Sequence, residues 1–138
     1  MAALQRDARA TFAEIGKQVG LSPSSVHERV RKLEQAKVIL NYRAEVDPEA
    51  LGLFVTALVS VMPLDPRQPD DLGDRVLSFP EVEDCYSVAG DENYILKVRT
   101  RTTSDLEELL RRLREKAGVQ TRTTVVLSTP FEHRPTSS

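Results

Sequence analysis

Apolar residues recur at helical spacing in the first third of the chain. Phe12, Ile15 and Val19 lie three and four positions apart, which predicts a short helix over residues 11–19. Gly20 follows, at the position where a helix commonly ends in a left-handed residue. The pattern therefore predicts a helix that stops at a tight glycine turn.

A second helix is predicted directly after this turn. Ser22 can cap its backbone amides, and Pro23 suits the first helical position, where no backbone donor is needed. Its apolar stripe consists of Val26, Val30 and Leu33. A helix, a tight turn and a capped helix form a helix-turn-helix, whose second helix presents its first residues to base edges in the DNA major groove.

The face opposite this stripe is small and polar first and basic later, at ~100° of rotation per residue. Its residues are Ser24, Glu28, Arg31 and Gln35, with Ser25 and Lys32 at the flanks. Small side chains allow close approach to DNA, and a capped helix N-terminus suits a phosphate. The predicted DNA contacts are Ser22, Ser24, Ser25, Glu28, Arg31 and Lys32. The competing interpretation, which periodicity alone favours, is a solvated helix face.

Residues 38–46 predict a strand that forms a wing, with Arg43 available to a phosphate. This strand, the glycine turn and the serine cap together favour DNA binding over a solvated face. Residues 47–52 are polar, with Pro48 and Gly52 near their ends, and predict a domain junction. We therefore expect a helix-turn-helix domain over 1–46, a linker over 47–52 and a second domain over 53–138.

Strand periodicity dominates the second domain. From residue 54 on, Val55, Ala57, Val59 and Val61 alternate with Phe54, Thr56, Leu58 and Ser60. A helix is predicted over 70–79, strands over 81–89 and 93–100, a helix from an N-cap at Ser104 with Glu107 as its capping-box partner, and a strand over 119–129. The order strand, helix, strand, strand, helix, strand predicts an α+β, ferredoxin-like domain: an antiparallel sheet with both helices on one face.

This topology leaves one face of the sheet without helices. Phe54 and Leu58 are expected there, and an exposed apolar patch usually marks a contact surface. We predict a homodimer that forms through this face. The competing interpretation is a wet face with scattered apolar residues.

Composition narrows the function further. The net charge of −2 argues against indiscriminate coating of nucleic acid, although residues 1–50 carry eight Lys and Arg against seven Asp and Glu. The sequence shows no apolar run long enough for a membrane span, no signal peptide and one cysteine, so we expect a cytoplasmic protein. His27, His133 and Cys85 lack metal-ligand spacing, and Cys85 is expected to be a small packing residue. We predict no enzyme activity.

The combination resembles the Lrp/AsnC, or feast/famine, transcriptional regulators over nearly the whole chain. The resemblance is carried by residues 7–16, 19–26, 29–34 and 38–39 in the first half, and by 88–94 and 119–127 in the second. It implies dimers that bind double-stranded DNA through paired helix-turn-helix units, often assembled into tetramers or octamers. It also implies an amino acid effector bound between subunits, with no metal, no cofactor and no catalysis. The family begins with a longer helix, so we expect a shortened first helix here.

The resemblance also indicates where the effector binds. A free amino acid needs an acceptor for its ammonium group and donors for its carboxylate, and a glycine-containing turn can direct amides at an anion. The predicted effector residues are Gly90, Asp91, Tyr94, Thr121 and Thr123, with Asp91 as the acceptor. The competing interpretation is a plain hairpin turn beside threonines that favour strands.

A second function remains open at this point. The chain could be a metabolite-binding oligomeric module whose DNA-binding half is weakened or vestigial and which acts through mixed oligomers. The shortened first helix motivates this alternative. DNA binding at low salt distinguishes the two functions.

Overall fold

The computed structural model describes residues 1–136, which form two compact units. One unit comprises Met1–Glu45 together with the C-terminal segment from Phe131, and the other comprises Val46–Pro130. The chain thus passes from the first unit to the second at residue 45 and returns after residue 130. The three-part division 1–46, 47–52 and 53–138 stays a prediction.

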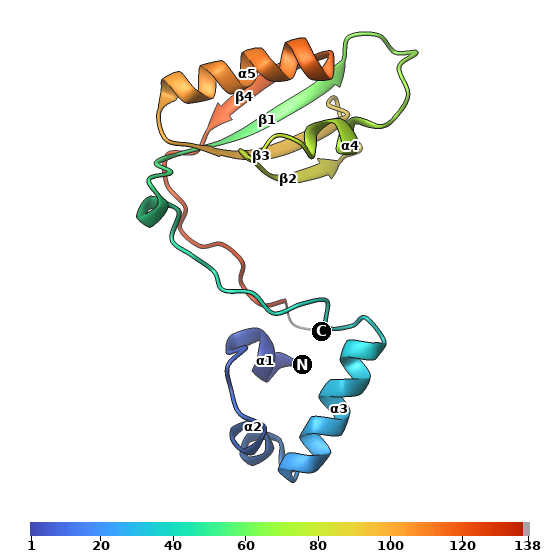
Figure 1. Ribbon diagram of the computed structural model, residues 1–138, viewed down its shortest axis with the longest axis vertical. Helices are drawn as coiled ribbons and strands as arrows, with labels where there is room; N and C mark the ends of the chain where they lie inside the picture. Colours follow the sequence, from blue (N-terminus) through green and yellow to red (C-terminus); the bar gives the residue numbers. More distant parts are fainter. Residues whose placement is uncertain (137–138) are drawn as a thin grey trace. The chain divides into compact units, whose positions relative to one another are not determined.

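The first unit contains three helices: α1 (Ala2–Arg6), α2 (Phe12–Val19) and α3 (Pro23–Gln35) (Figure 1). The Thr11 side chain accepts from the Glu14 backbone N–H, and the Glu14 side chain accepts from the Thr11 backbone N–H, which completes a capping box. Gly20 ends α2 at a φ of 72°. Ser22 Oγ accepts from the Ser25 backbone N–H at the start of α3. The predicted helix, glycine turn and capped second helix are confirmed.

The core of this unit is small. Its buried apolar residues are Ile15, Val26 and Val30, against which Ala3, Leu4, Ala10, Leu21 and Ile39 pack. Of the three apolar residues whose spacing predicted α2, Ile15 is buried, whereas Phe12 is 37% and Val19 54% exposed.

The predicted wing strand over residues 38–46 is absent from the described structure. This segment pairs with no strand among residues 1–136, so its backbone forms none of the hydrogen bonds of a sheet. Instead, Val38 and Ile39 both donate their backbone N–H to the Leu33 carbonyl, and Tyr42 donates to Glu34 Oε1 at 2.8 Å. The segment is held against the end of α3 by these bonds.

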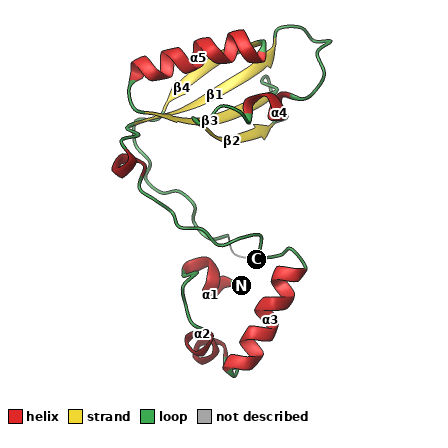
Figure 2. Ribbon diagram, in the orientation of Figure 1, coloured by secondary structure: helices red, strands yellow, loops and turns green. Residues whose placement is uncertain are grey.

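The second unit begins with a 3₁₀ helix, Pro48–Leu51, and continues with an α+β sheet domain. Its elements are β1 (Val55–Pro63), α4 (Leu72–Val76), β2 (Val82–Ser87), β3 (Tyr94–Thr100), α5 (Thr103–Ala117) and β4 (Val119–Val125). The strands pair antiparallel in the order β2-β3-β1-β4, which confirms the ferredoxin-like prediction. Both helices cover the same face of the sheet (Figure 2).

The predicted alternation of β1 holds in the structure. Ala57, Val59 and Val61 are fully buried, and they pack with residues of β3, α4 and α5 into the core of this unit. Leu106, Leu109 and Leu113 give α5 its buried stripe. Phe54 and Leu58 are exposed, as predicted for the helix-free face.

Three details of the second unit differ from the prediction. The N-cap of α5 is Thr102, whose hydroxyl accepts from the Asp105 N–H, rather than Ser104 with Glu107. The helix predicted over 70–79 is limited to five residues, although Phe79 remains buried. Cys85 is exposed rather than packed because β2 is an edge strand; partial desolvation still raises the pKa of its thiol.

Candidate functional site

The turn between α2 and α3 brings their backbones unusually close. Leu21 donates its backbone N–H to the Gly16 carbonyl at 3.0 Å, and a Cβ on Gly16 would lie 2.4 Å from the Leu21 carbonyl oxygen. Only a glycine fits this approach without a shift of the backbone. This close contact fixes the angle between α2 and α3.

The polar face of α3 is exposed along its whole length. Val26 and Val30 are buried on one side, while the predicted contact residues Ser24, Ser25, Glu28, Arg31 and Lys32 are exposed on the other. Arg43, in the segment after α3, is exposed as well. These side chains therefore lie outside the core of this unit.

Within this face, two groups are already hydrogen-bonded. Ser22 Oγ holds the Ser25 N–H at 3.3 Å and donates to Ser25 Oγ at 3.0 Å, so Ser22 acts as the helix cap. Arg31 Nη2 lies 3.1 Å from Glu28 Oε1, with both side chains about half exposed. This hydrogen bond holds the pKa of the Glu28 carboxyl below its ordinary value. The pair orients the Arg31 guanidinium on the outward face.

A second candidate site lies at one end of the sheet in the other unit. An open pocket of about 520 Å³ is lined by the loop after β1, residues of α4 and the turn between β2 and β3. Gly90 and Tyr94 line it, as the sequence predicted for an effector site. Tyr94 donates its hydroxyl to Asp70 Oδ1, a bond that raises the pKa of Tyr94.

The other three predicted effector residues do not line this cavity. Asp91 is exposed in the turn beside it. Thr121 and Thr123 lie on β4, where Thr121 pairs with Val61 of β1, and Val61 in turn pairs with Tyr94 of β3. Thr121 and Tyr94 are thus two strand spacings, roughly 10 Å, apart within one subunit. Thr121 Oγ1 accepts from Arg114 Nη1 at 3.3 Å.

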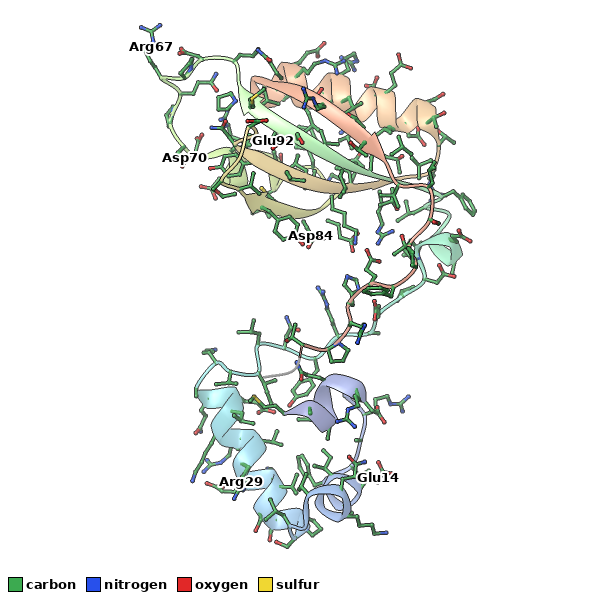
Figure 3. The ribbon with its side chains drawn as sticks, turned by 180° about the vertical axis from the view of Figure 1, so that it is seen from behind. Glu14, Arg29, Arg67, Asp70, Asp84 and Glu92 are labelled. Atoms are coloured by element: carbon green, nitrogen blue, oxygen red, sulfur yellow. The ribbon has the colours of Figure 1, made fainter. Side chains whose placement is uncertain are left out.

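The structure adds charged residues that the sequence pattern did not indicate. Glu92 and Asp70 lie at the same end of the sheet unit (Figure 3), and Glu92 Oε1 accepts from Ser60 Oγ at 3.3 Å. Arg75 also lines the cavity; its Nε lies 2.9 Å from Asp71 Oδ1, and it donates to the Ala117 carbonyl at the end of α5. The adjacency of Glu92 to the Gly-Asp turn was the one sequence signal that could have revealed it. The loop residues gave no such signal.

This arrangement can bind a small zwitterion. The carboxylates of Asp70 and Glu92 are acceptors for the ammonium group of such a ligand. The guanidinium of Arg75, which also lines the cavity, is a donor for its carboxylate. Met62, Pro63 and Leu72 give the cavity an apolar wall. Among residues 1–136 there is no group of His, Cys, Asp and Glu side chains that could hold a metal ion. None of the helices in that range is long and apolar enough to cross a bilayer.

Comparison with known proteins finds similarity over both units. Residues 1–34 match the AsnC-type helix-turn-helix domain, and residues 55–136 match the Lrp/AsnC ligand binding domain. The HTH-type transcriptional regulator LrpA of Mycobacterium tuberculosis is 47% identical over 131 residues, which cover 95% of this chain and 87% of LrpA. LrpC of Bacillus subtilis is 34% identical, over 91% of this chain and 85% of LrpC.

Solved structures give the same result. A feast or famine regulatory protein from M. tuberculosis, solved in complex with L-methionine, is 46% identical with a TM-score of 0.95, over 98% of this chain and 92% of that one. AsnC of Escherichia coli is 30% identical with a TM-score of 0.86, over 95% of this chain and 89% of that one.

Proposed function

Because this chain is a transcriptional regulator of the Lrp/AsnC family, we propose that it binds double-stranded operator DNA through the outward face of α3 and that an amino acid effector modulates this binding. The observation that carries the DNA-binding proposal is the division of α3 between a buried stripe and an exposed polar face that bears Ser24, Ser25, Arg31 and Lys32. Arg43 adds a cation beside it. The protein acts in the cytoplasm, without a cofactor and without catalysis.

A gel shift on the DNA upstream of the protein's own gene tests this proposal. Arg31→Ala is expected to weaken binding about tenfold, because a positioned arginine contributes roughly 1–3 kcal/mol to DNA recognition. Arg67→Ala, on a loop of the other unit with a side chain 92% exposed, is the matched control and leaves binding unchanged. Absence of binding at low salt, with the oligomer intact, contradicts DNA binding.

Assembly is the second part of the proposal. Two subunits associate through the helix-free face of the sheet, where Phe54 is 67% and Leu58 41% exposed. Pairing places two α3 helices at successive major grooves of one duplex face, near ~34 Å apart or a multiple of it. Further association into tetramers or octamers uses other surfaces.

For the effector, we propose the cavity beside the β2–β3 turn, with Gly90 and Tyr94 from its lining and Asp91 at its edge. Thr121 and Thr123 complete the site from a neighbouring subunit, since in one subunit they lie two strands away from Tyr94. The L-methionine complex of a relative supports an amino acid as the ligand class. The apolar wall formed by Met62, Pro63 and Leu72 suits an apolar side chain.

Calorimetric titration of the full chain with the common amino acids tests the effector site. Heat of binding is expected for at least one of them and is abolished by Asp91→Ala or Glu92→Ala. The control Glu107→Ala removes an exposed carboxylate from α5, away from the cavity, and leaves the heat unchanged. If none of the amino acids gives a heat of binding, the effector proposal is contradicted, and assembly remains as the role of the sheet unit.

The small core of the first unit favours one alternative function. With three buried apolar residues, this unit gains little stability from burial. A chain whose DNA-binding half is weakened would bind the effector and act through mixed oligomers with another regulator. The same gel shift distinguishes the two functions, because only the first requires DNA binding by this chain alone.

A further inference from the structure

An exposed aromatic stack joins the two helices of the helix-turn-helix. The rings of Phe12 and His27 lie with centroids 5.2 Å apart and planes inclined by 22°. Phe12 is the first residue of α2, and His27 is in the second turn of α3. Both are at the surface, so the stack is a feature of the unit's exterior.

The position of Phe12 is not explained by the core. The apolar residues of this described unit pack around Ile15, Val26 and Val30, and Phe12 stands outside that cluster with 37% of its surface exposed. A large apolar ring at the start of a helix contributes to stability only to the extent that other groups cover it and remove its surface from water. What covers one face of it here is the imidazole of His27.

His27 is exposed and lies at the border between the face of α3 that we assign to DNA and the buried stripe. At ~100° per residue, it lies roughly 40° from Arg31 and roughly 60° from Ser24 around the helix axis, and it is also roughly 60° from the buried Val30 on its other side. Its place in the second turn agrees with the geometry of these motifs, in which the first turns of the second helix reach the base edges. The imidazole therefore lies at the edge of the proposed DNA interface.

Stacking decides which part of the imidazole remains available. With one ring face against Phe12, the two ring nitrogens lie at the edge of the imidazole, in its plane. A neutral imidazole carries one donor and one acceptor there, and each base pair shows a distinct set of donors and acceptors in the major groove. A ring whose plane is fixed loses less conformational entropy when it forms such a hydrogen bond.

We propose that His27 hydrogen-bonds a base edge in the major groove and helps determine the operator sequence, and that Phe12 is a positioning residue that fixes the plane of its ring. The proposal rests on DNA binding through α3. It adds a specificity-determining residue, and a residue of α2 that acts through it, to the predicted contacts.

Selection from a random-sequence duplex library with the full chain tests the base contact. The wild-type chain is expected to enrich a motif, and His27→Ala is expected to enrich the same motif without preference at one base pair of each half-site. Affinity for the wild-type motif falls about tenfold, the loss expected for one base contact. An unchanged motif with a uniform loss of affinity identifies a backbone contact and overturns the proposal.

A double-mutant cycle tests the role of Phe12. Phe12→Leu keeps apolar bulk but removes the stack, so it is expected to weaken binding several-fold when His27 is present and to have no effect in the His27→Ala background. Phe12→Tyr retains a ring and keeps wild-type affinity. Val19→Ala, a change at another exposed apolar residue of α2, is the matched control and leaves the motif unchanged.

The remaining outcomes are also decisive. Additive losses from Phe12→Leu and His27→Ala overturn the positioning role. Thermal melts establish that each variant is folded; all of these changes are at exposed positions. If the wild-type chain enriches no sequence at all, sequence-specific DNA binding is contradicted, whereas an enriched motif that does not change in His27→Ala contradicts this inference alone.

Discussion

At the residue scale, two glycines shape the helix-turn-helix for different reasons. Gly20 adopts a left-handed backbone, which other L-residues rarely take. Gly16 has ordinary helical geometry, but its missing side chain allows the Leu21 carbonyl to approach. The first requirement follows from a turn and is visible in the sequence. The second follows from packing between two segments and is visible only in three dimensions.

Gly16→Ala is therefore expected to destabilise the first unit. The added methyl group would lie 2.4 Å from a backbone oxygen, which cannot move as a flexible side chain would. Overpacking of this kind costs about 1–3 kcal/mol in the free energy of unfolding. Chemical denaturation followed by circular dichroism measures the loss.

The matched control for this change is Gly73→Ala in α4. Nothing lies within 4 Å of a Cβ at Gly73. Alanine has a higher helix propensity, so stability is expected to stay equal or to rise by about 0.5–1 kcal/mol. Equal losses at both glycines would show that the close approach at Gly16 is unimportant.

At the element scale, helix α5 shows how a cap sets the start of a helix. Both Thr102 and Ser104 have the right chemistry for an N-cap, and the sequence pattern favoured Ser104. In the structure Thr102 has extended backbone angles and accepts from the Asp105 N–H at 3.0 Å, while Ser104 is already inside the helix. The end of β3, which pairs through Thr100, places the chain so that the helix begins earlier.

The two hydroxyls are expected to differ when each is removed. Thr102→Ala leaves an amide at the start of α5 without its acceptor and lowers the free energy of unfolding of the second unit by about 1 kcal/mol. Ser104→Ala changes it by less than about 0.5 kcal/mol, as is usual at an exposed site. Urea titration of both variants measures the difference, and a larger loss for Ser104→Ala would contradict the assigned cap.

At the scale of the whole molecule, the helix-free face of the sheet is the surface that we propose for assembly. The face carries the apolar residues Phe54, Leu58 and Met62, with exposed fractions of 67%, 41% and 38%. Lys97 and Arg99 stand on the same side of β3, since their neighbours Leu96 and Val98 are buried on the other. In the proposed dimer, a second copy of this face covers the apolar residues.

Leu58→Asp is expected to convert the dimer into a monomer. A carboxylate at the centre of an apolar contact loses its hydration without a partner, and such a burial costs several kcal/mol. Sedimentation velocity of the full chain measures the change in mass. Leu77→Asp, at a residue 82% exposed beside α4 on the helical side, is the control and leaves the mass unchanged. A dimer that persists in Leu58→Asp would assign association to another surface.

Helices α2 and α3 and strand β1 could be predicted because the residues that determine them are close together in the sequence. Capping residues, the glycine turn and the spacing of Val26, Val30 and Leu33 lie within a few positions of each other, and helix formation depends on such neighbours. The same holds for the alternation along β1, because a strand always turns successive side chains to opposite faces. The wing over residues 38–46 was predicted wrongly, since strand formation depends on a partner rather than on propensity alone.

The candidate sites divide in the same way. The outward face of α3 follows from helical geometry, so Arg31 and its neighbours could be named from the sequence, and whether they contact DNA stays a prediction. The cavity beside Tyr94 could not be derived in this way, because Asp70, Arg75 and Glu92 come from a loop, a helix and a turn that only the pairing of the strands brings together. The sequence by itself determined the order of the helices and strands apart from the wing, and the buried sides of α3 and β1. The tertiary structure alone decided which distant residues share a cavity, because those contacts depend on strand register and on the path of the chain between elements.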